Sequence, residues 1–123
     1  MNILLVDDNN ETRHFYSMAF KRAGHPTEIA ASGAEALELM RQQHFDAVVL
    51  DIEMPDMSGW KVLEAIGQMP DSQRTPVILY TAHHNPSSDA YAKILGAYAL
   101  LRKPIIPASL LEVVQKAVEE QAS

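Results

Sequence analysis

The residues of this sequence that could do chemistry follow short apolar runs. Two aspartates come directly after the first run, a third ends a run in the middle of the chain, and a threonine and a lysine follow the last two; these residues are Asp7, Asp8, Asp51, Thr81 and Lys103. If the runs are parallel strands, their carboxyl ends meet at the edge where doubly wound folds bind ligands. The spacing therefore predicts one polar site with three carboxylates, one hydroxyl and one ammonium.

Three crowded carboxylates repel one another unless a cation lies between them. Oxygen ligands without His or Cys suit Mg²⁺, with Mn²⁺ as a substitute. An aspartate can also attack phosphorus to form an acyl phosphate, helped by a lysine charge and a threonine hydrogen bond. Asp51 is the favoured nucleophile, because its strand is expected in mid-sheet, facing Asp7 and Asp8. Each residue alone could be a turn former or a cap, but together they indicate a Mg²⁺-dependent phosphoaspartate site.

The elements that must position this site are short strands alternating with helices. Continuous apolar runs predict strands covered by helices on both faces, at residues 3–6, 47–50, 77–80 and 99–101. Residues 27–30 follow Pro26 and predict an edge strand. Helices are expected at residues 10–23, after the S-x-x-E capping box of Ser32 and Glu35, at residues 58–67 and 85–96, and from Pro107 onward. Right-handed crossovers turn this order into a single doubly wound (βα)5 α/β domain over residues 1–123.

Helical spacing also predicts which side chains are buried. In residues 10–23 the apolar positions at this spacing are Phe15, Met18, Ala19 and Ala23, and Gly24 is expected to end the helix. In the last helix the predicted buried stripe is Leu110, Leu111, Val114 and Val118.

Composition narrows the classes of function. The chain has 123 residues, 47% of them hydrophobic, and its 10 Lys and Arg against 16 Asp and Glu give a formal net charge of −6. An acidic chain of this kind is not expected to bind nucleic acid, and the absence of cysteine excludes disulfides and thiolate metal sites. The N-terminus lacks a signal peptide pattern, and no apolar run approaches the roughly 20 residues of a membrane span. We expect a soluble, cytoplasmic protein that does not bind membranes.

Four segments together resemble the receiver domain of bacterial two-component response regulators, of the chemotaxis-regulator type. They are residues 3–9, residues 49–59, residues 76–82, and the Gly96-Ala97 and Lys103-Pro104 pairs, and they occur in family order and spacing over essentially the whole chain. The resemblance implies the flavodoxin-like strand order 2-1-3-4-5, with helices on both faces of the sheet. It also implies a signalling protein that is modified on an aspartate, rather than an enzyme.

The resemblance assigns roles to the site residues. Asp51 would accept a phosphoryl group from the phosphohistidine of a histidine kinase or a phosphotransfer protein. Asp8 and Asp51 would bind Mg²⁺ directly, Asp7 mostly through water, and the backbone carbonyl of Glu53 would be a further ligand. Thr81 would be the switch hydroxyl that moves toward the phosphoryl group.

The resemblance also extends to the segment around Lys103, which would pair with the phosphoryl group. The Lys103-Pro104 bond would be cis, which is essentially a proline phenomenon. Three residues before the lysine, where receivers carry a rotating Tyr or Phe, this chain has Leu100. We interpret Leu100 as an ordinary core or edge-strand residue, so coupling would run through the loop after Thr81, or through Tyr80 or Tyr98.

Two further positions differ between receivers. Glu53 lies two residues after Asp51, and His83 lies two residues after Thr81. In the family these positions flank the phosphoryl group and tune its hydrolysis; the alternative is that both side chains point to solvent. The remaining histidines show no metal-ligand spacing.

The resemblance implies a readout surface formed by residues 85–96, 99–102 and 107–120. Tyr91, Ile94 and Tyr98 could be exposed there for a partner, or could be core residues. Phosphorylation would switch this surface to control a downstream protein, a C-terminal output domain absent from this chain, or a homodimer.

Two other classes of function share features with this sequence. The alternative function is a haloacid-type phosphohydrolase, which also forms a phosphoaspartate but needs Asp where this chain has Glu53. An FMN-binding flavodoxin is disfavoured, because residues 7–10 are Asp-Asp-Asn-Asn rather than a phosphate-binding Ser/Thr/Gly loop.

Overall fold

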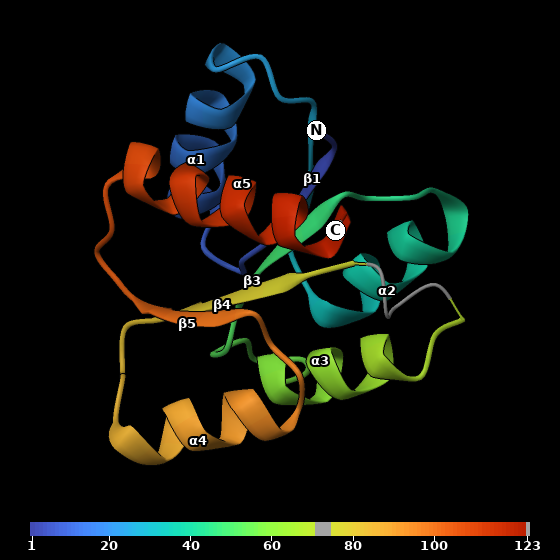
Figure 1. Ribbon diagram of the computed structural model, residues 1–123, viewed down its shortest axis with the longest axis vertical. Coiled ribbons are helices and arrows are strands. Elements are labelled where there is room, and N and C mark those ends of the chain that lie inside the picture. Colours follow the sequence, from blue (N-terminus) through green and yellow to red (C-terminus); the bar gives the residue numbers. More distant parts are fainter. Residues whose placement is uncertain (71–74, 123) are drawn as a thin grey trace.

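Five parallel strands form the central sheet of the computed structural model, which describes residues 1–70 and 75–122 (Figure 1). In chain order they are β1 (Ile3–Val6), β2 (Thr27–Ala30), β3 (Ala47–Asp51), β4 (Val77–Thr81) and β5 (Ala99–Arg102). They lie side by side in the order β2-β1-β3-β4-β5, so the expected strand order and the edge position of β2 are confirmed. The order changes direction between β1 and β3, which is the switch point where ligands bind in doubly wound folds.

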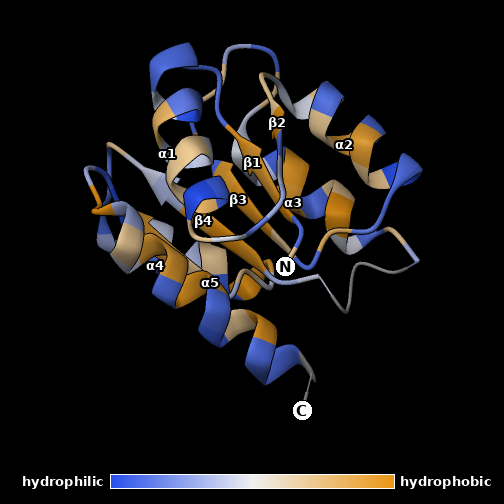
Figure 2. Ribbon diagram, turned by 90° about the horizontal axis from the view of Figure 1, so that it is seen from above, coloured by the Kyte–Doolittle hydropathy of each residue, from blue (hydrophilic) through white to orange (hydrophobic). Residues whose placement is uncertain are grey.

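Helices cover both faces of the sheet. They are α1 (Asn10–Arg22), α2 (Gly33–Gln42), α3 (Gly59–Gly67), α4 (Pro86–Ile94) and α5 (Pro107–Ala122). One core cluster joins the sheet to α1 and α5, and the other joins it to α2, α3 and α4. Figure 2 shows β1, β3 and β4 as an apolar centre, with hydrophilic residues on the outer sides of the helices. The described helices include none with both the length and the apolar character needed to cross a membrane.

Side-chain caps begin four of the helices. Each cap oxygen accepts a hydrogen bond from the backbone N–H three residues later, at Asn9, Ser32, Ser58 and Asn85. The predicted start after Ser32 is confirmed, and the Glu35 carboxylate reaches back to the N–H of Ala31 at 3.1 Å. Gly24 and Gly96 have φ of +92° and +87°, a conformation open to glycine, and lie just beyond α1 and α4.

The predicted buried face of α1 is wrong. Tyr16 and Phe20 face the sheet with exposed fractions of 5% and 0%, whereas Phe15 is 58% exposed. The buried face of the helix is shifted by about one residue from the predicted face. The prediction failed because apolar residues occupy nearly every position from 15 to 20, so their spacing alone does not select one face. In α5 the buried stripe includes Leu110 and Val114 as predicted, together with Ala117, while Leu111 and Val118 are only partly buried.

Candidate functional site

Asp7, Asp8 and Asp51 meet at the carboxyl edge of the sheet. The pairing of β1 with β3 aligns Val6 with Leu50, so the residue that follows β1 lies beside the last residue of β3. One carboxylate oxygen from each of the three aspartates lies within 4.8 Å of the other two. Asp7 and Asp51 are 0% and 4% exposed, whereas Asp8 is exposed. The convergence predicted from the sequence therefore occurs.

The loop after β3 folds tightly against Asp51. The N–H of Gly59 donates to the carbonyl of Ile52 at 2.7 Å. A Cβ atom on residue 59 would lie 2.5 Å from the carbonyl oxygen of Asp51, which is closer than carbon and oxygen can approach. Only glycine lets the start of α3 lie this close, and the packing holds the backbone of Asp51 in place.

Asp7 is surrounded by hydrogen-bond donors. Its Oδ1 accepts from the N–H of Asn9 at 2.8 Å. Its Oδ2 accepts from the phenol of Tyr80 at 2.6 Å and from Nζ of Lys103 at 2.9 Å. These donors compensate for burying a carboxylate that has lost its water.

Lys103 links the buried carboxylates. Its Nζ lies 2.9 Å from Oδ2 of Asp7 and 3.4 Å from Oδ1 of Asp51, and it lies 4.3 Å from the centre of the Tyr80 ring. The N–H of Lys103 donates to the carbonyl of Thr81 at 2.8 Å, which aligns the end of β5 with β4. The Lys103-Pro104 peptide bond is cis, as expected from the sequence.

Burial makes Asp51 a weaker acid than usual. Loss of water is the largest cause and raises the pKa of this carboxyl from 3.8 to about 6; Lys103 opposes the rise, and the negative charge of Asp7 adds to it. The three carboxylates supply hard oxygen ligands, which suit Mg²⁺. The excess negative charge, only partly offset by one lysine, fits a divalent cation. The acidic cluster is therefore compatible with the metal that the sequence predicts.

Thr81 contacts the side chain of Glu53 across the carboxyl edge. Its Oγ1 donates to Oε1 of Glu53 at 2.8 Å and accepts from the N–H of His83 at 3.1 Å. Nε2 of His83 lies 3.4 Å from Oε2 of Glu53, and the two side chains are 80% and 46% exposed. Of the two alternatives left open by the sequence, Glu53 therefore lies against the site, whereas His83 lies at its solvent edge.

The other predicted residues lie on α4, on β5 and in the loop between them. Leu100 is partly buried and packs against the core, as our interpretation of this residue expects. Tyr91, Ile94 and Tyr98 are 43%, 78% and 37% exposed. The sequence left open whether these three residues belong to the surface or to the core, and their exposure shows that they belong to the surface.

Tyr80 is the site residue that sequence reasoning underestimated. From the sequence we considered Tyr80 only as one of several residues that could couple the site to the surface. In the structure it is fully buried, and its hydroxyl lies in the acid pocket formed by Asp7, Asp8 and Asp51. Burial, and then the charge of Asp7, raises the pKa of the phenol far above its ordinary value, so it remains a donor. The available signal was a phenol at the penultimate position of a strand that is otherwise apolar until its last residue, Thr81.

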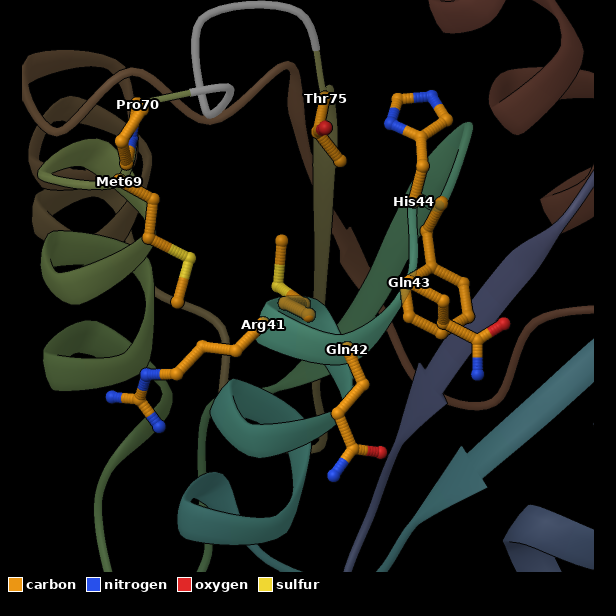
Figure 3. A pocket seen from close by; sticks show the side chains of 9 residues that line it. Arg41, Gln42, Gln43, His44, Met69, Pro70 and Thr75 are labelled. Carbon is orange, nitrogen blue, oxygen red and sulfur yellow. The ribbon is translucent and has the colours of Figure 1, made fainter.

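Among the described residues, cavities lie near both the carboxyl and the amino ends of the strands. One of about 510 Å³ opens beside Lys103 and Pro104 and is walled by Phe15 and its neighbours on α1. The other, of about 440 Å³, lies at the amino ends of β3 and β4, away from the carboxylates (Figure 3). Among the residues that line it, Arg41 pairs with Glu38 at 3.2 Å, and Nε2 of His44 lies 3.8 Å from Oδ1 of Asp46.

The strand order and the acid cluster at the switch point place the chain among the flavodoxin-like α/β proteins with an acidic site. Comparison with known proteins identifies its family. The model of the response regulator receiver domain matches residues 3–115, and the chain belongs to this family. A CheY-like receiver domain protein from Methanospirillum hungatei superimposes with a TM-score of 0.91 at 28% identity, covering 98% of this chain and 95% of that one. Chemotaxis protein CheY4 of Vibrio cholerae gives 0.90 at 32% identity, with 94% and 97% covered.

Longer proteins contain similar segments. The chain is 38% identical over 120 residues to the regulatory protein AtoC of Escherichia coli, covering 98% of this chain and 26% of that protein. It is 37% identical over 107 residues to the histidine-protein kinase BarA of the same species, covering 85% of this chain and 11% of that protein. The chain thus spans about a quarter and about a tenth of these relatives. Family membership makes it a phosphorelay receiver, and the comparisons give no support to a haloacid-type phosphohydrolase.

Proposed function

We propose that Asp51 is the residue of this receiver that carries the phosphoryl group. The observation that carries the proposal is the meeting of two carboxylates, from Asp7 and Asp8, with that of mid-sheet Asp51, whose Oδ1 lies 3.4 Å from Nζ of Lys103. A carboxylate oxygen of Asp51 would form a bond to phosphorus while the N–P bond of a phosphohistidine breaks and the imidazole leaves. Lys103 would stabilise the charge of the transferred group.

The proposal includes Mg²⁺, or Mn²⁺, as the metal of this site. Asp8 and Asp51 would hold it directly, Asp7 through water, and the backbone carbonyl of Glu53 would add an oxygen ligand. The support is the all-oxygen donor set within 4.8 Å and its excess of negative charge. When bound, the metal neutralises charge on the incoming phosphoryl oxygens.

The switch that we propose begins at Thr81. In this structure its hydroxyl donates to Glu53 at 2.8 Å. A phosphoryl group on Asp51 offers new acceptor oxygens, so Thr81 would exchange Glu53 for the phosphoryl group and move the loop between β4 and α4. His83 and Glu53 would tune the lifetime of the phosphoryl group from the edge of the site.

The donor would be a histidine kinase or a phosphotransfer protein. The cavity of about 510 Å³ beside Lys103, with Phe15 exposed on its wall, offers a docking surface next to the carboxylates. The readout surface would be α4, β5 and α5, where Tyr91, Ile94 and Tyr98 are exposed. It would act on a downstream protein, an output domain or a second copy of the chain.

We further propose that residues 1–123 form one receiver domain that acts in the cytoplasm without turnover of its own. The support is the family match over residues 3–115 and the absence of cysteine, which suits a reducing compartment. Glu53 also argues against a haloacid-type phosphohydrolase, because its carboxylate accepts the Thr81 hydroxyl rather than serving as the aspartate acid that such enzymes need.

The test is phosphorylation by acetyl phosphate, followed by intact mass. We expect one phosphoryl group on the wild type with Mg²⁺, none with EDTA, and none on Asp51→Asn. Asp46→Asn is a matched control, because Asp46 lies before β3, at the opposite edge of the sheet, and should still be labelled. Labelling that survives Asp51→Asn would show that another residue is the acceptor, and high turnover of a phosphomonoester would favour the phosphohydrolase.

A further inference from the structure

Tyr80 brings a phenol into the centre of the acid pocket. The pairing of β3 with β4 places Tyr80 opposite Asp51, and the phenol reaches Oδ2 of Asp7 at 2.6 Å. The residue is 0% exposed. An apolar side chain at this buried strand position would leave no polar atom that needs a hydrogen-bond partner. A buried hydroxyl does need one, which suggests that the phenol has a role within the site.

That role follows from the hydrogen bonds that Asp7 accepts. Tyr80 and Lys103 both donate to Oδ2 of Asp7, at 2.6 Å and 2.9 Å, while Oδ1 accepts from the N–H of Asn9. The ammonium also lies 4.3 Å from the centre of the Tyr80 ring. The lysine is thus held by the carboxylate and by the ring, and both contacts weaken if it moves toward a phosphoryl group on Asp51.

We propose that Tyr80 is a positioning residue that stays with Asp7 when Lys103 transfers to phosphorylated Asp51. This inference rests on the proposed function, because only a phosphoryl group on Asp51 draws the lysine away. Without the phenol, the transfer would leave Oδ2 of Asp7 with no side-chain donor, which costs free energy because this carboxylate is 0% exposed. With it, Asp7 keeps a hydrogen bond throughout, and Lys103 is released at lower cost.

Tyr16 provides a matched control within the same core. Its ring packs edge-on against that of Tyr80 at 5.9 Å, and it too is nearly fully buried. Its hydroxyl donates instead to the carbonyl of Ile105 at 2.6 Å. Tyr16→Phe therefore removes a buried phenol hydroxyl of the same kind from a backbone carbonyl, whereas Tyr80→Phe removes it from the acid pocket.

The first experiment separates the rate of phosphorylation from metal binding. Both variants and the wild type are titrated with Mg²⁺ by calorimetry and then labelled with acetyl phosphate at saturating Mg²⁺. We expect Tyr80→Phe to lower the limiting rate about tenfold, the loss expected for one hydrogen bond to a charged group. The dissociation constant for Mg²⁺ should change much less than the rate, because Lys103 still donates to Oδ2 of Asp7 until transfer. Tyr16→Phe should match the wild type in both.

A second measurement needs no substitution at Tyr80. The chain has 4 tyrosines, so protein labelled with 3-fluorotyrosine should give one fluorine resonance for each. Tyr16→Phe, Tyr91→Phe and Tyr98→Phe assign three resonances and leave that of Tyr80. We expect the Tyr80 resonance to shift when Mg²⁺ and beryllium fluoride are added, because the ammonium leaves the ring face.

The outcomes separate this inference from the proposed function. A wild type that is not labelled on Asp51 overturns the proposed function, and this inference with it. A labelled wild type with an equal rate in Tyr80→Phe overturns only the role of Tyr80. An equal loss in Tyr16→Phe, a parallel loss of Mg²⁺ affinity, or an unmoved Tyr80 resonance also overturns it.

Discussion

Asp51→Asn should stabilise the protein while abolishing its phosphorylation. The carboxyl is 4% exposed, and burial raises its pKa from 3.8 to about 6. The folded state therefore binds this proton more tightly than the unfolded chain. The stability that protonation contributes is fully present below pH 3.8, and it is lost as the pH rises to about 6.

The magnitude follows from the size of the shift. One pKa unit corresponds to about 1.4 kcal/mol, so ionised Asp51 costs about 3 kcal/mol of folding free energy near neutral pH. Asparagine carries no charge, and its carbonyl can still accept from the N–H of Glu53, as Oδ1 of Asp51 does at 3.2 Å. Lys103 keeps Asp7 as a partner at 2.9 Å. We therefore expect a gain of about 3 kcal/mol near pH 7.5 and about 1 kcal/mol near pH 4.5.

Urea unfolding followed by circular dichroism, with EDTA present, measures this gain. At the higher pH the midpoint of Asp51→Asn should rise by about 1–3 M. Mg²⁺ should stabilise the wild type and narrow the difference, because it binds the folded state with Asp51 ionised. Asp8→Asn is the matched control: Asp8 is exposed, so its substitution should change stability by about 0.5 kcal/mol or less. A gain that is absent, or equal at both pH values, would refute the reasoning.

Two further substitutions test the packing and the charge of the site. Gly59→Ala should lower stability by about 1–3 kcal/mol in thermal unfolding, because the new Cβ would lie 2.5 Å from the carbonyl oxygen of Asp51. Gly67→Ala is the control and should not destabilise the protein, because a Cβ there would have nothing within 4 Å. Equal losses in the two variants would contradict the packing argument. Glu53→Gln should raise the rate of phosphorylation by acetyl phosphate severalfold, because it removes a negative charge that repels the anionic donor; an unchanged or slower rate would show that this charge is screened.

The fold was predictable because its signals are local. Four of the five strands contain a continuous apolar run, and the starts of α2 and α4 are marked by a side-chain cap at Ser32 and at Asn85. Because the strands are parallel, the residue types at their carboxyl ends meet at one edge. The convergence of the three aspartates could therefore be predicted without any knowledge of side-chain contacts.

Contacts between distant residues could not be predicted in this way. The face of α1 was wrong because Phe15, Tyr16 and Phe20 offer two apolar stripes, and only packing against β1 and β3 selects one. The contact of Tyr80 with Asp7 joins residues 73 positions apart. It depends on the direction of one side chain, which strand alternation suggests but no local pattern specifies.

Leu100 and Glu53 together constrain how the proposed switch can work. Leu100 packs against the core and has no ring that could rotate into space vacated by Thr81. The contact that phosphorylation would have to break is the 2.8 Å hydrogen bond from Thr81 to Glu53. Thr81 would exchange one anionic acceptor for another, so the bias between the two loop positions is the difference between the two hydrogen bonds and not the full strength of either. Repulsion between the phosphoryl group and Glu53, which lies in the loop after β3, would add to that bias.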